Sequence, residues 1–304
     1  MTNQLDLRDL RYFEAIAETG HLGHAAEKVF RSQPALTGCV RRLEAVLGTA
    51  LFERAGRGIR LTAAGDALAR RARSLRVAAE DTVREIKEVG AGISGHIRIG
   101  VLPTLARFLM PPLCRAFLHD APGVTLRTVI AQNDVLASQL ETGEVDFILT
   151  TAVRASEEVV THAILEDEAV VIASRSHPIL ARRARLQDLL SYRWVLAPPS
   201  VGTRQWIERV FHSRGLPGPD VQIETNLILM MPTLIRQTEL LTFTSRRHVD
   251  LVDAGTDLGE VRLKETTMRR RFDVAYRRDG YLSPASQRLI RLLRTQGRAL
   301  FSGE

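Results

Sequence analysis

Residues 10–65 read LRYFEAIAETGHLGHAAEKVFRSQPALTGCVRRLEAVLGTALFERAGRGIRLTAAG, and the apolar residues of this segment recur at helical spacing. Three such patterns follow one another, the first ending at Gly20 and the third at Gly48. Steps of three and four residues place each apolar set on one face of a helix. We therefore expect three short helices, whose inward positions are Leu10, Phe13 and Ala17, then Leu22, Ala25, Ala26, Val29 and Phe30, then Leu36, Val40, Leu43 and Leu47.

The second and third of these helices are joined only by Arg31 and Ser32. A connection this short, with the small pair Ala25-Ala26 upstream, suits a helix-turn-helix, because small residues let two helices cross closely. Ser32 is a suitable N-cap, and Pro34 would fall in the first turn, where its missing N–H costs little. In this motif the third helix enters the DNA major groove. The residues it would present there are Ser32, Gln33, Pro34, Thr37, Gly38, Arg41 and Arg42.

The outward side chains have the chemistry of DNA readers. Glutamine can bind adenine bidentately, threonine can contact a base edge or a methyl group, and arginine can bind guanine or phosphate. The net charge changes from −3 over residues 1–27 to +5 over residues 28–60, as expected when one side packs and the other meets a polyanion. Three-helix patterns also occur in bundles that bind no nucleic acid, so the pattern alone leaves that alternative open.

The next twelve residues, LFERAGRGIRLT at positions 51–62, predict a small β-hairpin, or wing. Two short extended pieces around Phe52 and Ile59 flank a tip at Gly56–Gly58. Arginine side chains on such a wing can bind phosphate groups. The candidates are Arg54, Arg57 and Arg60.

Residues 62–90 predict one long helix, since they contain no proline and carry apolar or small residues in alternating steps of four and three. This is coiled-coil spacing, and the stripe needs a partner because an isolated helix of this kind is marginal. We expect the helix to pair two copies of the chain; packing within one chain is the alternative. The stripe consists of Leu68, Ala72, Leu75, Ala79, Thr82, Ile86 and Val89.

The sequence GAGISG at residues 90–95 matches the pattern G-x-G-x-x-G. A dinucleotide site needs this motif after a strand and before a helix, whereas here it follows a helix and precedes the strand-like HIRIGV. We interpret it as a flexible joint between domains. The expected division is a DNA-binding domain over residues 1–62, a linker helix with its hinge over 63–92, and a further domain over 93–304.

From His96 onward, strand-like and helix-like segments alternate, which indicates an α/β domain of mostly parallel strands covered by helices. The domain is large for one sheet, so we expect lobe I at about 93–166 and 267–304 and lobe II at about 167–266, joined by crossover strands near 166–169 and 266–271. The expected strands are 96–101, 124–131, 145–151, 169–174, 194–197, 221–224, 240–244 and 272–276, and the expected helices are 105–119, 135–141, 204–213, 229–236, 246–252 and 284–296.

Ligands of open α/β sheets bind at the carboxyl ends of strands, where helix N-termini present free N–H groups. Leu102-Pro103-Thr104 follows a strand and opens a helix in lobe I, and PPSVGT at residues 198–203 does the same in lobe II. We expect a small anion or polar metabolite between them, although each hydroxyl alone could be only an N-cap. No arginine or lysine is evident at these strand ends, so the charge of the ligand stays open. The candidate residues are Leu102, Pro103, Thr104, Gln132, Asn133, Thr151, Ser200, Gly202, Thr203, Phe243 and Thr244.

The segment from Leu10 to Gly65 resembles the N-terminal domain of LysR-type transcriptional regulators. The matching residues are Leu10, Phe13, Ala25-Ala26, Ser32-Gln33-Pro34-Ala35, Leu43-Glu44, Leu47-Gly48, Leu51-Phe52, Arg54, Leu61-Thr62 and Gly65. The resemblance continues more diffusely over the rest of the chain. It implies an α winged helix-turn-helix with a long linker helix, followed by an α/β two-lobed, periplasmic-binding-protein-like effector-binding domain. Gly38 and Cys39 depart from the family pattern, which leaves the base preference open.

The resemblance also implies roles for residues and partners. The residues it places on DNA are Gln33, Pro34, Thr37 and Arg54, and those it places on the effector are Thr104, Ser200 and Thr203. The implied partners are double-stranded promoter DNA, a small-molecule co-inducer of unknown identity, RNA polymerase, and further copies of the chain in a dimer or tetramer. We expect no cofactor besides the effector.

We expect a cytoplasmic protein, because no secretory signal is visible and two cysteines cannot form a disulfide framework. The longest uncharged apolar run, Leu227–Ile235, is too short to span a membrane. A solute-binding or transport protein with the same two-lobed cleft is the alternative, but it would need a signal peptide and no basic N-terminal domain.

Catalysis finds little support, and we expect neither catalytic nor metal-binding residues. The eight histidines fit no metal spacing, and the sequence contains no phosphate loop or nucleophile elbow. An enzyme built on the same lobes stays a third alternative. The remaining features are expected to be structural: His21 and His24 as cap or surface residues, Cys39 as partly packed, Glu166–Glu168 as a solvated strand edge, and the arginines of Arg269–Arg298 as a solubilising surface.

Overall fold

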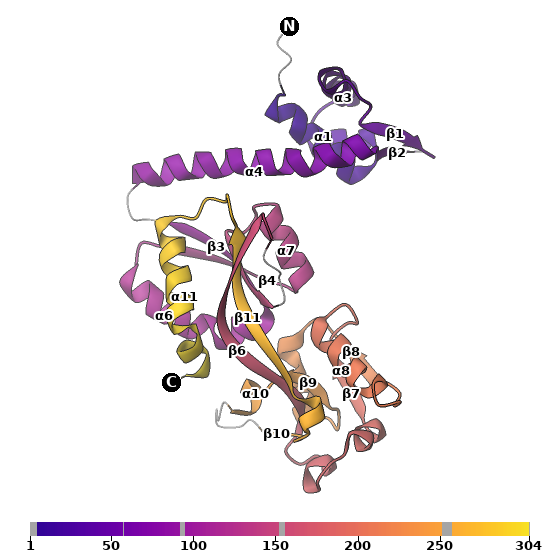
Figure 1. The fold of residues 1–304 in the computed structure, drawn as a ribbon, viewed down its shortest axis with the longest axis vertical. Helices are drawn as coiled ribbons and strands as arrows, with labels where there is room; N and C mark the ends of the chain where they lie inside the picture. The colour runs from indigo at the N-terminus through magenta and orange to yellow at the C-terminus, as the bar shows by residue number, and fades with distance from the viewer. Residues whose placement is uncertain (1–4, 57, 92–94, 152–155, 251–256, 304) are drawn as a thin grey trace. The chain divides into compact units, whose positions relative to one another are not determined.

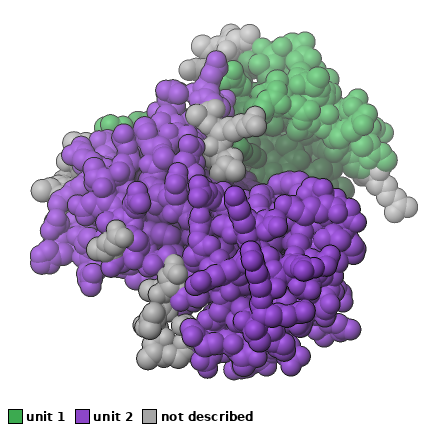
Figure 2. Space-filling view, turned by 60° about the horizontal axis from the view of Figure 1, so that its bottom comes forward, with its two compact units in different colours: residues 1–92, 141–143 green, residues 93–140, 144–304 purple. Residues whose placement is uncertain are grey.

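The computed structural model describes residues 5–56, 58–91, 95–151, 156–250 and 257–303. The chain divides into two compact units, residues 1–92 with 141–143 and residues 93–140 with 144–304 (Figure 2). Half of the glycine joint expected at residues 90–95, namely residues 92–94, lies outside the described residues, and residues 90 and 91 belong to the end of a long helix. Within the described residues, no helix is long and apolar enough to cross a membrane.

The first unit begins with three short helices, as the apolar spacing predicts. Asp6 caps the first by accepting the Arg8 N–H at 2.8 Å, and Gly20 ends it with a φ of 61°. Gly48 ends the third in the same left-handed conformation, with a φ of 68°. The helices are α1 (Leu7–Thr19), α2 (Leu22–Lys28) and α3 (Gln33–Leu47).

The buried faces of these helices differ from the predicted ones at a few positions. Leu47 is 39% exposed at the end of α3, and Cys39, one turn after Leu36, is fully buried instead. In α1, Ala15 and Ile16 are buried whereas Ala17 is only half-buried. The inward stripes of α1 and α3 are therefore rotated slightly from those that we inferred from apolar spacing.

Phe30 is the clearest error among the predicted core residues, because its side chain is 91% exposed. It follows the end of α2 in a left-handed conformation, with a φ of 54°. The Phe30 N–H donates to the Glu27 carbonyl and the Arg31 N–H donates to the Ala26 carbonyl, at 3.1 and 2.9 Å. This is a Schellman turn, which ends the helix and directs the side chain at its left-handed position away from the core.

A two-stranded wing and a long helix follow. Strands β1 (Phe52–Ala55) and β2 (Gly58–Leu61) pair antiparallel, as expected. Helix α4 (Ala63–Ala91) has 29 residues. Gly65 in its first turn lies against the segment before the wing, where a Cβ would stand 2.1 Å from the Leu51 carbonyl oxygen. Only glycine fits this close approach.

The second unit is organised around a sheet of seven strands in the order β10-β6-β11-β5-β3-β4, with β9 also paired to β6. A separate two-stranded parallel sheet, β7 with β8, completes lobe II. The strands are β3 (His96–Val101), β4 (Thr125–Ile130), β5 (Phe147–Thr151), β6 (Val159–Ser174), β7 (Arg193–Leu196), β8 (Asp220–Glu224), β9 (Thr242–Ser245), β10 (Leu258–Glu260) and β11 (Met268–Arg277).

Strands β6 and β11 are the crossovers between the lobes (Figure 1). They pair antiparallel from Met268 opposite Ala169 to Arg277 opposite Val159. Our prediction of mostly parallel strands is wrong, since only β3–β4, β3–β5 and β7–β8 pair in parallel among the described strands. The crossovers run through the main sheet against each other and so make it mixed. We also missed the first part of β6, residues 159–165, in which Thr161 and His162 interrupt the apolar residues.

Helices cover this sheet. The single helix expected at residues 105–119 is two, because Pro111 and Pro112 can only lie in a first helical turn, where no N–H is needed. The helices are α5 (Pro103–Phe108), α6 (Met110–Asp120), α7 (Asn133–Glu141), α8 (Gly202–His212), α9 (Met231–Arg236), α10 (Arg247–Asp250) and α11 (Pro284–Ser302), with 3-10 turns at Pro178–Ala181, Leu186–Ser191, Ile228–Met230 and Lys264–Thr266.

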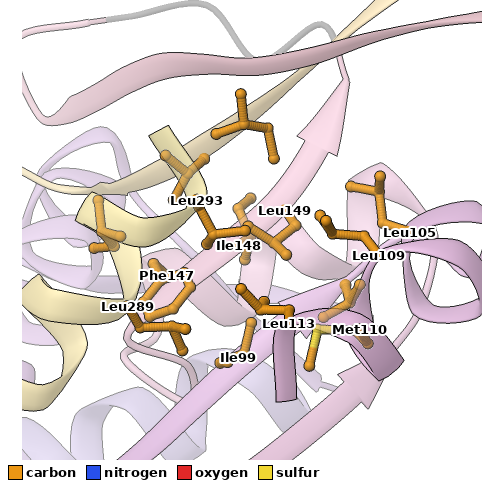
Figure 3. Close-up of a cluster of buried hydrophobic side chains, with 14 of the residues drawn as sticks. Ile99, Leu105, Leu109, Met110, Leu113, Phe147, Ile148, Leu149, Leu289 and Leu293 are labelled. Atoms are coloured by element: carbon orange, nitrogen blue, oxygen red, sulfur yellow. The ribbon is translucent and has the colours of Figure 1, made fainter. Parts of the chain in front are cut away.

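Each lobe has its own hydrophobic core. In lobe I, apolar side chains of α5, α6 and α11 pack against the central strands. Leu113 of α6 and Leu289 of α11 belong to this cluster, and β5 contributes Phe147 (Figure 3). In lobe II, one cluster surrounds Trp194 and a second surrounds Met231, on the two faces of its strands. Separate cores joined by two strands allow the lobes to act as distinct bodies.

Candidate nucleic-acid interface and interlobe cavity

The beginning of α3 carries the residues that we expect to read DNA. Gln33 and Pro34 are its first two residues, and both are exposed, as is Arg41 two turns later. Thr37 is half-buried, and its hydroxyl donates to the Gln33 carbonyl at 3.1 Å. Ser32 occupies the N-cap position, but its hydroxyl makes no capping hydrogen bond. Its side chain is therefore available to a partner at the exposed end of the helix.

Arg42 is held within the first unit. Its Nε and Nη2 donate to both carboxylate oxygens of Asp9 on α1, at 2.9 and 2.6 Å. This hydrogen-bonded pair raises the pKa of the guanidinium further above its ordinary value. A bidentate pair of this kind fixes geometry as well as charge. Arg42 thus braces α1 against α3, and it is less suited than Arg41 to a direct phosphate contact.

The wing presents arginines of different kinds. Arg54 is exposed and forms no ion pair with any described residue, whereas Arg60 pairs with Glu53 at 2.7 Å. Arg57 lies outside the described residues. The wing is fastened to the end of α1, because the Ile59 N–H donates to the Gly20 carbonyl at 3.0 Å. Arg54 therefore projects from a hairpin whose position within the unit is set.

Cys39 is a structural residue of this unit. Its side chain is fully buried, and burial raises the pKa of the thiol to about 12. The Sγ lies 3.2 Å from the Asp9 carbonyl, to which it donates. A thiol that stays protonated is a poor nucleophile. Cys39 therefore packs more completely than the partly packed position that we expected, and its thiol is not activated for redox chemistry.

His21 caps α2, as one of the two structural interpretations of the His21/His24 pair expected. Its Nδ1 accepts the Gly23 N–H at 3.1 Å, and its ring lies 4.6 Å from that of His24. Among the described residues, no group of three or more histidine, cysteine or acidic side chains could hold a metal ion.

A cavity of about 460 Å³ lies between the lobes of the second unit. This volume falls in the range of small-molecule sites. Ten of the eleven residues that we expected around an effector line it, and Ser200 is the exception. Ser200 is exposed in the turn before α8, outside the lining. The lining residues that we predicted are Leu102, Pro103, Thr104, Gln132, Asn133, Thr151, Gly202, Thr203, Phe243 and Thr244.

The strand ends of lobe I are joined by hydrogen bonds beside the cavity. The Asn133 amide donates to the Thr151 hydroxyl at 3.1 Å, and its carbonyl oxygen accepts from the Thr150 hydroxyl. These bonds orient the side chain at the start of α7. The carbonyl end of Asn133 is therefore engaged by the protein before any ligand arrives.

Arg270, on the crossover strand β11, is the cation that the sequence did not reveal. Its guanidinium donates to the Asp167 carboxylate at 2.6 and 2.8 Å, and to the Thr104 hydroxyl at 3.3 Å. Only 11% of the Arg270 side chain and 2% of the Asp167 side chain are exposed. The second Asp167 oxygen accepts from Ser245 at 2.8 Å. The resulting network joins lobe I, both crossovers and lobe II.

Two interpretations of charged runs are therefore wrong in part. In the acidic run at Glu166–Glu168 only Glu166 is exposed as expected, since Asp167 is buried against Arg270 and Glu168 pairs with Arg246 and Arg269. Arg270 is not part of a solubilising surface either, since only 11% of its side chain is exposed, whereas the side chains of Arg269 and Arg271 are exposed as predicted although they also line the cavity. The prediction does hold further on, where exposed arginines of α11 such as Arg291 and Arg294 face water.

Arg209 on α8 is a further cation on the cavity wall. It is exposed and forms no ion pair with any described residue, whereas Arg271 pairs with Asp273 at 2.8 Å. The rest of the additional lining is largely apolar. It includes Ala197, Val201, Ile228, Met231, Met268 and Phe272.

One signal in the sequence could have identified Arg270. The run Arg269-Arg270-Arg271 lies just before the apolar strand FDVAY, in a segment that we had already identified as a crossover. Alternation along a strand must direct one of three consecutive side chains to the opposite face from its neighbours. That face lies at the lobe junction, so an inward cation was to be expected there.

Comparisons with known proteins assign the family. Residues 7–66 match the family profile described as bacterial regulatory helix-turn-helix protein, lysR family, and residues 90–298 match the LysR substrate binding domain. The chain belongs to the LysR family and is a DNA-binding transcriptional regulator with an effector-binding domain. The solute-binding or transport alternative is wrong, because the similar curated proteins are transcriptional regulators.

Individual relatives are similar over most of the chain. The RuBisCO operon transcriptional regulator of Allochromatium vinosum is 31% identical over 285 residues, covering 93% of each chain. The HTH-type transcriptional regulator PcaQ of Agrobacterium fabrum is 31% identical over 230 residues, covering 73% of this chain and 72% of the relative.

Solved structures share the fold. A full-length variant of OxyR from Pseudomonas aeruginosa superposes with a TM-score of 0.64 at 22% identity, covering 98% of this chain and 96% of that one. Full-length CbnR in complex with its target DNA superposes with a TM-score of 0.62 at 21% identity, covering 95% of this chain and 99% of that one.

Proposed function

We propose that this regulator binds promoter DNA as an oligomer and that a small organic acid in the interlobe cavity controls it. The observation that carries this proposal is the ligand-sized cavity between the lobes, because its lining includes the Thr104 hydroxyl and Arg209, which forms no ion pair with any described residue. The role of the chain is binding, and we expect no catalytic turnover. Promoter DNA as its partner implies action in the cytoplasm.

The cavity suits a ligand with one anionic group and an apolar body. Arg270 is already neutralised by Asp167, but Arg209 is not paired with any described residue. Phe243 and Met231 offer apolar contact beside the polar ends of the helices. A carboxylate could therefore bind Arg209 and the Thr104 hydroxyl while the remainder of the ligand packs against apolar side chains.

Such a ligand favours lobe closure because both lobes contribute to its site. A closed arrangement allows Thr104 of lobe I and Thr203 of lobe II to contact the ligand together, so the ligand binds that state more tightly. The two crossovers β6 and β11 are the connections about which the lobes would move. The ligand can shift the equilibrium between open and closed lobes only by the difference between its binding free energies for the two states.

Helix α4 supplies a surface for pairing two copies. Leu68 and Ala72 of the predicted stripe pack in the first unit, whereas Leu75 and Ile86 are 47% and 68% exposed, as is Val83 at 55%. Apolar side chains left exposed along a helix at coiled-coil spacing fit a second helix. Pairing through α4 would supply two α3 helices for two half-sites. A tetramer and contact with RNA polymerase are expected from the LysR family alone.

A thermal-shift screen tests the effector site. Aromatic, sugar-derived and short aliphatic carboxylic acids are added singly to the full chain, and the active compound is then titrated. Thr104→Val keeps the shape of the side chain and removes the hydroxyl, so the shift should need about tenfold more ligand. Ser200→Ala, outside the cavity lining, is the matched control and should leave the shift unchanged.

The same variants separate the effector from DNA binding. Thr104→Val should leave a footprint on the promoter of the chain's own gene intact. If no carboxylic acid stabilises the protein, or if Ser200→Ala weakens the response as much as Thr104→Val does, the assignment of the cavity is wrong.

A further inference from the structure

Lobe II carries a second large concave site, a groove of about 1100 Å³. Three segments build it: residues 183–186, the second half of α8 with Arg214, and residues 262–267. None of the lining residues is shared with the interlobe cavity. The groove is lined by Arg183, Ala184, Arg185, Leu186, Trp206, Val210, Arg214, Arg262, Leu263, Lys264, Glu265 and Thr267.

The charge of this groove is strongly one-sided. Five of its side chains are cationic and one, Glu265, is anionic. None of the five cations forms an ion pair with a residue that the structure describes, and all five are exposed. By contrast, Arg182, Arg193 and Arg204 of the same lobe each lie within 3.7 Å of a carboxylate.

Concentrating unpaired cations in a concavity is unfavourable unless an anion is bound. Like charges repel, and a concave low-dielectric wall focuses their field. The arginines converge from three separate segments rather than lying along one helix face. A solubilising surface needs no such convergence, because cations spread over a convex surface serve equally well.

A stacked aromatic pair and helix α8 link the groove to the effector cavity. Trp206 lines the groove, and its ring stacks on that of Phe243 with centroids 5.4 Å apart and planes 3° from parallel. Phe243 lines the interlobe cavity. Helix α8 serves both sites, since Gln205 and Arg209 line the cavity whereas Trp206 and Val210 line the groove.

We propose that this groove binds a small anion that carries two or more phosphate groups, as a second ligand site separate from the effector cavity. Guanidinium groups bind phosphate oxygens bidentately, and four of the five cations are arginines. A single carboxylate would leave most of the excess positive charge unbalanced. A concave groove built from three segments accepts a small ligand more readily than the convex surface of a duplex.

Titration with inorganic pyrophosphate tests the proposal on the full chain, with tryptophan emission as the readout. The sequence has two tryptophans, and Trp194 is fully buried in the core of lobe II, so changes in emission report Trp206. We expect a saturable change that weakens as salt is added. Citrate at equal ionic strength should bind more weakly than pyrophosphate, because its carboxylates match the arginines less well.

Variants locate the site. Arg262→Ala with Lys264→Ala should raise the Kd for pyrophosphate about tenfold or more. Arg182→Ala with Arg193→Ala removes the same charge elsewhere on lobe II and should leave the Kd unchanged. Arg209→Ala, on the cavity side of α8, should also leave it unchanged, which distinguishes this site from the proposed effector site.

Three outcomes would overturn the proposal. One is the absence of a saturable response to pyrophosphate, and another is an equal loss of affinity in the two double variants. The third is a loss in Arg209→Ala alone, which would place the anion in the interlobe cavity.

A parallel titration with a promoter duplex identifies the source of the phosphates. The affinity for the duplex should be the same for Arg262→Ala/Lys264→Ala and wild type. If the double variant loses affinity for the duplex and the wild type shows no saturable response to pyrophosphate, the groove binds DNA instead.

Discussion

The DNA-reading surface of the first unit and the interlobe cavity of the second use arginine in opposite ways. Arg41 and Arg54 are exposed and form no ion pair with any described residue, so they are ready to meet phosphate. Arg270 is largely withdrawn from water, with 11% of its side chain exposed, and is held by Asp167 and Thr104. A surface that meets a polyanion gains from free cations, whereas a cation kept from water requires its own counter-charge. The same residue type therefore has a different energetic role in each region.

Replacing Arg270 should have the largest effect on stability. Arg270→Gln leaves Asp167 buried without its cation, and we expect the free energy of unfolding to fall by about 3–5 kcal/mol. Urea denaturation followed by circular dichroism measures this change. Arg270→Gln with Asp167→Asn should recover much of the loss, since no uncompensated charge is left. Arg54→Gln is the same substitution at the exposed surface and should leave the urea midpoint unchanged. Equal midpoints for Arg270→Gln and wild type would remove the proposed contrast.

Acid should destabilise the second unit through His248. Burial lowers the pKa of His248 to about 4, and its ring packs edge-on against Phe108 at 4.7 Å. The unfolded chain binds a proton below about pH 6.5, whereas the folded chain does not until about pH 4. Stability is therefore full above pH 6.5 and should fall by up to about 1.4 kcal/mol per pH unit between those values.

His248→Gln removes this titration and should flatten the decline in melting temperature between pH 6.5 and 4. His119→Gln, at an exposed position of α6, is the matched control and should keep the wild-type slope. An unchanged slope in His248→Gln would show that other groups carry the acid sensitivity.

The two kinds of DNA contact should separate by their sequence dependence. Arg54→Ala removes an exposed cation of the wing and should weaken binding to all duplexes about tenfold, with a smaller salt dependence. Gln33→Ala should weaken binding chiefly to the cognate base pair and so reduce discrimination at one position. Fluorescence anisotropy over a series of single-base operator changes measures both. Gln187→Ala, on an exposed turn of lobe II, serves as control. If both variants lost affinity uniformly, Gln33 would be a backbone contact and not a base reader.

The smallest effect is expected at Phe30, where the first unit carries backbone strain. Phe30 has a φ of 54° and a side chain that is 91% exposed, so it gains little from packing. Asparagine adopts the left-handed conformation more readily than phenylalanine. Phe30→Asn should raise the free energy of unfolding by about 0.5–1 kcal/mol. Phe30→Ala removes the same ring and lacks this preference, so it should stabilise less. A loss of stability in Phe30→Asn would indicate that the ring makes a favourable contact.

Predictability differed between the two regions for a physical reason. In the first unit, the ends of α1 and α3 at Gly20 and Gly48 and the start of α3 at Gln33 could be predicted, because caps and apolar periodicity act within a few residues. The prediction for Phe30 was wrong because its spacing matched a core position, whereas a turn of the backbone directs its side chain outward. In the second unit, ten cavity residues were placed from strand ends, but Arg209 and Arg270 were not.

The sequence alone determined the family, the three-helix unit with its wing, and the presence of Gln33 and Arg41 on an exposed helix, because each depends on neighbours along the chain. Only the tertiary structure decided which cations line the cavity and which of them is already paired. Arg270 meets Asp167 across paired strands and Thr104 from 166 positions earlier, and Ser245 completes the network. The same holds for the basic groove, whose cations come from three distant segments. Contacts between such distant residues follow from strand register and lobe packing, which no local pattern specifies.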